Sequence, residues 1–162
     1  MRSTLKKVGL LLVASMLIQS AGLAESGGKT AKSEFIERVL QLTNREREKA
    51  GLQPLELDLK LSSSASWKAD DMADKDYFDH SDGGGRDFVD RAEKFGYADW
   101  TYLGENIAAG QPTPEEVVQE WMASPGHRKN ILKPQYREIG IGYAAAPRSS
   151  FRSYWVQEFG TR

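Results

Sequence analysis

Two histidines are the residues in this sequence best suited to bind a metal ion or to accept a proton. His80 and His127 are the only histidines, and each lies in a predicted loop or helix start rather than on an apolar face. The first turn of a helix carries the positive end of the helix dipole, which disfavours a protonated His127. A neutral imidazole is the form that binds metals or accepts protons. A surface or structural role for each histidine is the alternative interpretation.

Glu105 is the carboxylate expected beside these histidines. It lies in Gly104-Glu105-Asn106, inside an apolar segment that is predicted to be a strand. An acidic residue in such a segment needs a partner. The alternative is that Glu105 ends a strand at the surface. No serine-nucleophile, zinc-protease, phosphate-loop or dinucleotide motif occurs in the sequence, so no activated nucleophile is predicted.

Apolar periodicity predicts the elements that must position these side chains. Apolar residues three and four apart favour five helices, beginning near Glu34, Asp58, Phe88, Pro114 and Pro125. Alternating or continuous apolar runs favour three strands, over Leu103–Ala109, Ile139–Ala145 and Phe151–Phe159. His80 then falls in a glycine-rich loop, Glu105 on a strand and His127 in the first turn of a short helix.

The last two predicted strands indicate how the layers pack. Gly140, Gly142 and Ala144 form a face of small residues, which implies that another element packs very close against it. Residues 154–156 are apolar on successive positions, as in a strand that is covered on both sides. We therefore expect an α+β fold, a three-layer α-β-α sandwich with a short antiparallel sheet between helices.

The first 24 residues have the three parts of a secretory signal peptide. A basic start precedes an apolar run from Val8 to Ile18, and small residues stand at Gly22 and Ala24. We expect residues 1–24 to be a cleaved signal peptide, 25–33 a disordered leader and 34–162 one domain in a secreted or periplasmic protein. The run is too short to span a membrane, so a permanent membrane anchor is the less favoured alternative.

Charge and cysteine content limit the classes of partner. Three of the 22 basic residues lie in the signal segment, which leaves 19 against 23 acidic residues. An acidic domain lacks the broad basic face that nucleic acid requires, so no nucleic-acid partner is expected. The sequence has no cysteine, so packing alone must hold an exported fold. We expect a monomer.

Five separated stretches resemble the CAP superfamily, the SCP-like extracellular proteins of the cysteine-rich secretory, antigen 5 and pathogenesis-related type, in a bacterial cysteine-free form. They follow the family's order and extend over about Phe35 to Gly160. The stretches are Asn44–Arg47 with Gly51-Leu52 and Pro54-Leu55, Tyr77–Ser81, Gly104–Ala108, Trp121–Leu132, and Ile139–Gly142 with Tyr154–Gln157.

The resemblance implies an α-β-α sandwich whose cleft holds two histidines and two acidic residues, often with a divalent metal such as zinc. His80, Glu105 and His127 match three of those positions. The second acidic position falls on Ser124, and Glu120 is the nearby acid, so the fourth cleft residue is left open between them. Two imidazoles and a carboxylate would make a three-ligand zinc set with water in the fourth place.

Three functions are compatible with these residues. The first is a non-catalytic module whose cleft binds a divalent metal and a small-molecule, peptide or cell-envelope ligand. The second is a metal-dependent hydrolase of peptide or cell-wall bonds, with Glu105 as the general base. The third is a lipid- or sterol-binding module, which we rank lower because the family members that carry lipid share cysteine-bearing loops that this chain lacks.

Overall fold

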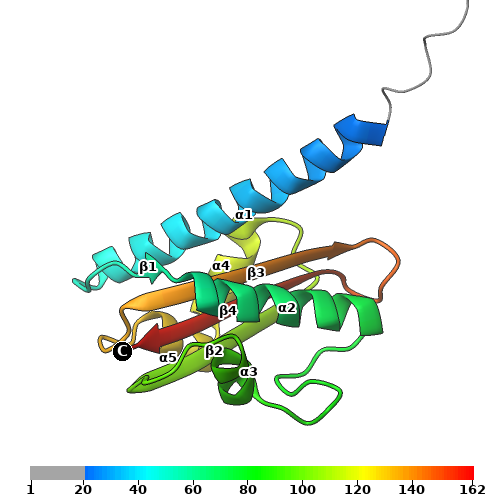
Figure 1. Ribbon diagram of the computed structural model, residues 1–162. Coiled ribbons are helices and arrows are strands. Elements are labelled where there is room, and N and C mark those ends of the chain that lie inside the picture. The colour runs from blue at the N-terminus through cyan, green and yellow to red at the C-terminus, as the bar shows by residue number, and fades with distance from the viewer. Residues whose placement is uncertain (1–20) are drawn as a thin grey trace, which may run out of the picture.

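The structure is a computed structural model that describes residues 21–162, with side chains from residue 31 on. Residues 1–20 of the predicted signal peptide lie outside the described residues. The elements, shown in Figure 1, are α1 (Ala21–Lys49), β1 (Glu56–Leu57), α2 (Leu59–Lys75), α3 (Phe88–Lys94), β2 (Tyr102–Ala109), α4 (Pro114–Ala123), α5 (Pro125–Ile131), β3 (Glu138–Ala146) and β4 (Arg152–Thr161).

Four strands form one sheet in the order β1-β3-β4-β2. β4 pairs antiparallel with both β3 and β2, whereas the two-residue β1 pairs parallel with β3. Helices α1, α4 and α5 cover one face, and α2 and α3 cover the other (Figure 1). The predicted α-β-α sandwich is confirmed, and β1 adds a short parallel pair that the sequence did not indicate.

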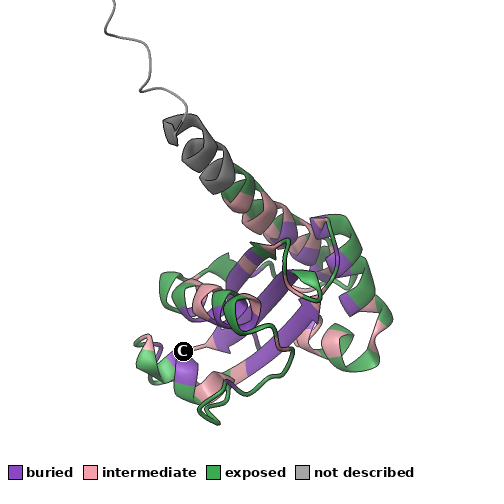
Figure 2. Cartoon of the chain, turned by 90° about the vertical axis from the view of Figure 1, so that its right-hand side faces the viewer, coloured by how far each residue is buried: buried purple, intermediate pink, exposed green. Residues whose placement is uncertain are grey.

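The larger of the two main apolar clusters lies between the sheet and the layer of α1, α4 and α5. Val39 of α1 and Trp121 of α4 are buried there against Ile139, Ile141 and Trp155. Figure 2 shows the strands buried between helices whose outer faces are exposed. Because residues 153–160 of β4 are all buried, the prediction that this strand is covered on both sides is confirmed.

The small-residue face of β3 lies directly against α2. A Cβ atom added at Gly140 would lie 2.1 Å from the carbonyl carbon of Leu61, and one added at Gly142 would lie 2.1 Å from the carbonyl oxygen of Ala65. These are backbone atoms, which cannot move aside as a flexible side chain can. The expected close approach is therefore confirmed, and it sets the spacing between α2 and the sheet.

Helix α1 begins at Ala21 and therefore includes residues 25–33, for which the sequence predicted a disordered leader. The glycines at positions 27 and 28 lower helix propensity and favoured a loop. Extending a helix that packing already holds costs far less than starting one. The packed part of α1, around Val39, supplies that start, and Lys32 reaches Asp70 of α2 with 3.4 Å between Nζ and Oδ1.

Arg47 of α1 holds the end of α5 in place. Its buried guanidinium donates hydrogen bonds to the carbonyl oxygens of Gln53, Ile131, Lys133 and Tyr136. Several backbone acceptors at the end of a helix are thus satisfied by one side chain. The arginine of the Asn44–Arg47 motif is therefore a structural residue, and it fixes the helix that carries His127.

We predict that Gly142→Ala destabilises the domain by about 1–3 kcal/mol, because the new methyl group has to displace α2 from the sheet. Urea unfolding followed by circular dichroism measures the difference. Gly126→Ala is the matched control, since a Cβ at Gly126 meets no atom within 4 Å. Equal stability of the two variants would contradict the close packing of α2.

Candidate functional site

His80 is paired with a buried carboxylate. Its Nδ1 lies 2.7 Å from Oε1 of Glu105, and the His80 side chain is 54% exposed whereas that of Glu105 is 0% exposed. An ionised carboxylate accepts a hydrogen bond from Nδ1–H, which leaves Nε2 as the nitrogen with a free lone pair. The pair therefore offers an imidazole nitrogen of fixed tautomer on an exposed side chain.

Arg91 of α3 engages the other oxygen of Glu105. Its Nη2 donates to Oε2 of Glu105, and its Nη1 donates to the backbone carbonyl of His80 over 2.9 Å. Both carboxylate oxygens of Glu105 are thus occupied by protein groups. Glu105 consequently holds and orients His80.

Glu158 lies beside Glu105 in the sheet, since the two residues are register partners on β4 and β2. Its Oε1 lies 3.8 Å from Nη2 of Arg91 and accepts a hydrogen bond from Ser64 over 2.9 Å. Burial, together with the negative charge of Glu105, raises the pKa of Glu158 to about 8. One guanidinium therefore faces two carboxyl groups, and Glu158 keeps its proton at neutral pH.

The loop that carries His80 is also fixed by Lys68 of α2. The buried Nζ of Lys68 donates to the hydroxyl of Tyr77 and to the backbone carbonyl of Ser81, both over 2.9 Å. Burial lowers the pKa of Lys68 to about 8. Since Arg91 binds the preceding carbonyl, two buried cations hold consecutive residues of the loop.

Asn106, the residue that follows Glu105, positions the backbone of His127. The amide nitrogen of Asn106 donates to the backbone carbonyl of His127 over 3.2 Å. Asn130, one turn later on α5, donates to the Asn106 side chain over 2.9 Å and to the carbonyl of Glu105 over 3.0 Å. β2 lies at one edge of the sheet, with α3 against one of its faces and α4 and α5 against the other.

The electrostatics of His127 link it to His80 and Glu120. Partial burial lowers the pKa of His127, and electrostatic repulsion from His80 lowers it further, whereas Glu120 opposes the shift. Glu120 accepts a hydrogen bond from Gln111 over 2.6 Å. Ser124 caps the N-terminus of α5 without a side-chain hydrogen bond. Of the two candidates for the fourth residue, Glu120 is the one whose charge acts on a histidine.

The available donor atoms limit the kind of metal site that fits. Within residues 21–162, no three histidine, cysteine or acidic side chains gather in a geometry that could hold a metal ion. Each carboxylate oxygen of Glu105 already accepts a hydrogen bond, one from His80 and one from Arg91. The three-ligand set of His80, Glu105 and His127 that the resemblance implied therefore stays a prediction.

Sequence reasoning missed Arg91, Glu158 and Lys68. Each stands at a position where a charged residue is ordinary, two on helices and one near the end of a strand. The available signal was Glu158 itself, an acidic residue that follows a run of apolar positions in a strand predicted to be buried. Such a residue requires a buried partner, as was argued for Glu105.

Comparison with known families identifies the fold. The family model of the cysteine-rich secretory protein family, CAP, matches residues 40–159, most of the chain. The chain belongs to this CAP family. The match contains Glu105, His80 and His127 together with the buried arginine that supports them, so the residues described above all lie within the family domain.

Two curated proteins of Bacillus subtilis (strain 168) are similar to this CAP domain. The uncharacterized protein YkwD is 49% identical over 127 residues, which are 78% of this chain and 47% of YkwD. The uncharacterized membrane protein YlbC is 32% identical over 143 residues, which are 88% of this chain and 39% of YlbC. The chain thus spans less than half the length of either relative.

Solved structures share the CAP fold. An extracellular protein of Bacillus anthracis that contains an SCP domain superposes with a TM-score of 0.76 at 27% identity, over 88% of this chain and 45% of that one. An outer surface protein of Borrelia burgdorferi gives a TM-score of 0.72 at 22% identity, over 80% and 93% of the two chains. Among residues 21–162, no helix combines the length and the apolar character needed to cross a bilayer.

The raised pKa of Glu158 predicts a pH-dependent stability. Between pH 4.5, the ordinary carboxyl value, and about 8, the folded state holds a proton that the unfolded state has lost. The contribution of Glu158 to the free energy of unfolding is therefore fully present below pH 4.5. It decreases by up to ~1.4 kcal/mol per pH unit as the pH rises toward 8. Urea unfolding at several pH values should show this slope in the wild type relative to Glu158→Gln. If the stability difference between the wild type and Glu158→Gln did not change with pH, the raised pKa of Glu158 would be contradicted.

We predict that Glu105→Gln, in a sample that circular dichroism shows to be folded, releases the tautomer of His80. An amide can present either its oxygen or its nitrogen to Nδ1, so the preference for a proton on Nδ1 is lost. Nitrogen chemical shifts of the imidazole in a labelled protein distinguish the tautomers. Glu120→Gln, which does not contact His80, is the control and should leave the His80 tautomer unchanged.

Proposed function

We propose that this CAP domain binds a divalent cation such as zinc through His80 and His127, and that it presents the cation to a small or peptide-like ligand without turnover. The observation that carries the proposal is the His80–Glu105 pair, whose fixed tautomer leaves one imidazole nitrogen available. Glu105 acts as a positioning residue in this proposal. Water or the ligand would fill the remaining coordination positions.

The surroundings of both histidines support a metal-binding role. Metal-binding histidines commonly donate their second ring nitrogen to a carboxylate, which fixes the ring and raises its basicity. The lowered pKa of His127 keeps that imidazole neutral to a lower pH, and a neutral ring is the form that binds a metal. Glu120 would add negative charge near a bound cation.

A location outside the cytoplasm is part of the proposal. It is supported by the signal-like sequence of residues 1–24 and by the similarity to a Bacillus anthracis protein described as extracellular. YlbC, by contrast, is described as a membrane protein. We propose that this chain is exported, to the cell surface, the periplasm or the medium.

A hydrolase remains a second candidate because the buried carboxylate, the imidazole and an exposed nitrogen are arranged as in a general base. The base would then be His80, since Glu105 is fully buried and both its oxygens are engaged. This replaces Glu105, the general base of the sequence-based hypothesis. No serine or cysteine nucleophile is assigned, so a bound water would have to attack.

We predict that the tag-free protein binds one zinc ion and that His80→Ala with His127→Ala abolishes this binding. Isothermal titration calorimetry measures the affinity. Glu105→Gln should weaken it by roughly 10- to 100-fold, because the ring of His80 loses its orienting partner. Affinity should also fall as the pH drops into the range where the imidazoles gain protons, because only the neutral ring binds a metal.

Lys129→Ala is a suitable control, because it changes a charge on the same helix and leaves both imidazoles in place. Its zinc affinity should equal that of the wild type. Zinc binding that persists at full strength in the double histidine variant would overturn the proposal. Chelator-sensitive hydrolysis of peptide or cell-wall substrates that is lost in His80→Ala would favour the second candidate.

A further inference from the structure

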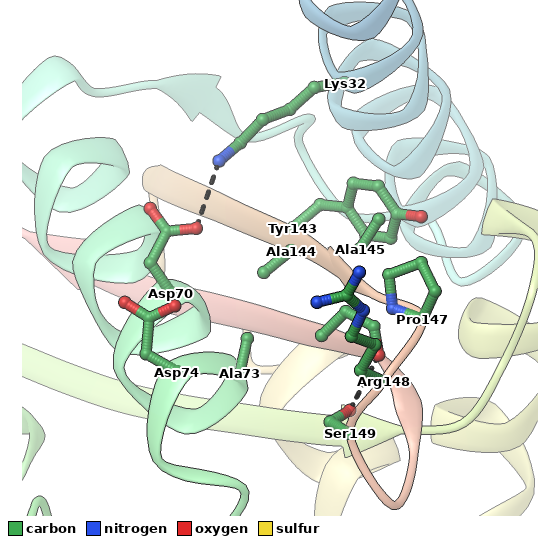
Figure 3. A pocket seen from close by; sticks show the side chains of 11 residues that line it. Lys32, Asp70, Ala73, Asp74, Tyr143, Ala144, Ala145, Pro147, Arg148 and Ser149 are labelled. Carbon is green, nitrogen blue, oxygen red and sulfur yellow. Dashed lines mark hydrogen bonds and ion pairs between the residues drawn. The ribbon is translucent and has the colours of Figure 1, made fainter.

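A pocket of about 630 Å³ lies away from the histidines, between α1, α2 and the hairpin that joins β3 to β4. We call it the hairpin pocket; its lining includes Lys32, Asp70, Asp74, Tyr143, Ala145 and Arg148 (Figure 3). Its volume is within the range of about 300–1,000 Å³ that is typical of small-molecule sites. Three elements that are distant in the sequence form its walls, and four consecutive residues of β3, from Tyr143 to Ala146, form its base.

The base of the hairpin pocket is an open sheet edge. β1 pairs only with Glu138 and Ile139, so the rest of β3 has no strand on that side. At Gly140 and Gly142, α2 lies directly on the strand. Farther along, Ala145 is exposed and Tyr143 and Ala146 are partly exposed. The edge is therefore accessible at its far end, where the pocket lies.

The backbone groups of Tyr143 and Ala145 point out of this edge. The carbonyl of Ile139 faces β1, because it accepts a hydrogen bond from Asp58 over 3.0 Å. Backbone direction repeats every second residue in a strand, so positions 141, 143 and 145 face the same way. The partner strand gives the same result. Ser153 of β4 is the register partner of Ala145, but its carbonyl accepts a hydrogen bond from Gly110 over 3.0 Å, on the side away from β3.

Unpaired charges stand above this edge. Lys32 forms an ion pair with Asp70, but within the described residues the side chains of Asp74 and Arg148 have no hydrogen bond or ion pair. Figure 3 shows the Arg148 guanidinium reaching toward α2, the helix that carries both aspartates. One wall thus offers a free anion and another offers a free cation. A ligand that satisfies both carries one positive and one negative group, as the ammonium and carboxylate ends of a short peptide do.

We propose that the hairpin pocket binds a short extended peptide, whose backbone adds to the free edge of β3 at Tyr143 and Ala145 and whose charged ends meet Asp74 and Arg148. Strand addition at an exposed edge is a general mode of peptide recognition in which main-chain hydrogen bonds supply the affinity. An open edge is otherwise a liability that proteins cover or charge. The pocket is independent of both histidines.

The test uses tetra-alanine with free ends, titrated into the nitrogen-15-labelled protein and followed by NMR. The amide signals of Tyr143 and Ala145 should shift. Ala145→Pro removes the outward N–H without disturbing the bonds to β4, and it should weaken binding roughly tenfold. Ala145→Thr keeps the N–H and is the matched control, with affinity within about twofold of wild type.

Tetra-alanine with acetylated and amidated ends should bind several-fold more weakly than the free peptide. Arg148→Gln should remove most of the difference in affinity between the free and the capped peptide. This variant tests the proposal even if Ala145→Pro fails to fold. Absence of amide shifts at millimolar peptide would overturn the proposal, as would unchanged affinity in Ala145→Pro. A wild-type dimer in sedimentation that Ala145→Pro dissociates would also overturn it, because a second copy would then occupy the edge.

Discussion

The guanidinium of Arg91 is the interaction on which the candidate site depends. It lies in the interior between carboxyl groups of two adjacent strands, Glu105 and Glu158, and it also holds the backbone of His80. A buried carboxylate without a counter-charge is strongly unfavourable. Arg91 supplies that counter-charge to Glu105, whose side chain has no exposure to water. Glu105 in turn holds the His80 ring through Nδ1.

Two adjacent residues of β2, Glu105 and Asn106, form hydrogen bonds on opposite faces of the sheet. On β2, Glu105 binds the loop after α2, and Asn106 binds α5 on the opposite face. The alternation of side chains along a strand makes this division unavoidable. Because β2 lies at the edge of the sheet, both histidines depend on one short segment of backbone. Any shift of this strand therefore moves both imidazoles together.

Much of the fold could be predicted from the sequence because it follows from local patterns. The small-residue face of β3 and the apolar run of β4 indicated close packing and full burial, and both are present. His80 and Glu105 were predicted by their motifs. Arg91 and Lys68 were not, since a helix shows no sequence signal for which of its charged residues turns inward. The helical state of residues 25–33 depends on packing elsewhere in α1, which local propensity does not contain.

The central place of β4 in the sheet affects the order in which the domain can fold. β2 and β3 are each paired along their length only with β4, yet they are separated from each other by two helices. Until residues 152–161 are present, neither strand has a long partner, and only the two-residue β1 can pair with β3. Sheet formation must therefore wait for β4, and a nascent chain that ends before it would expose two long strands without a long partner.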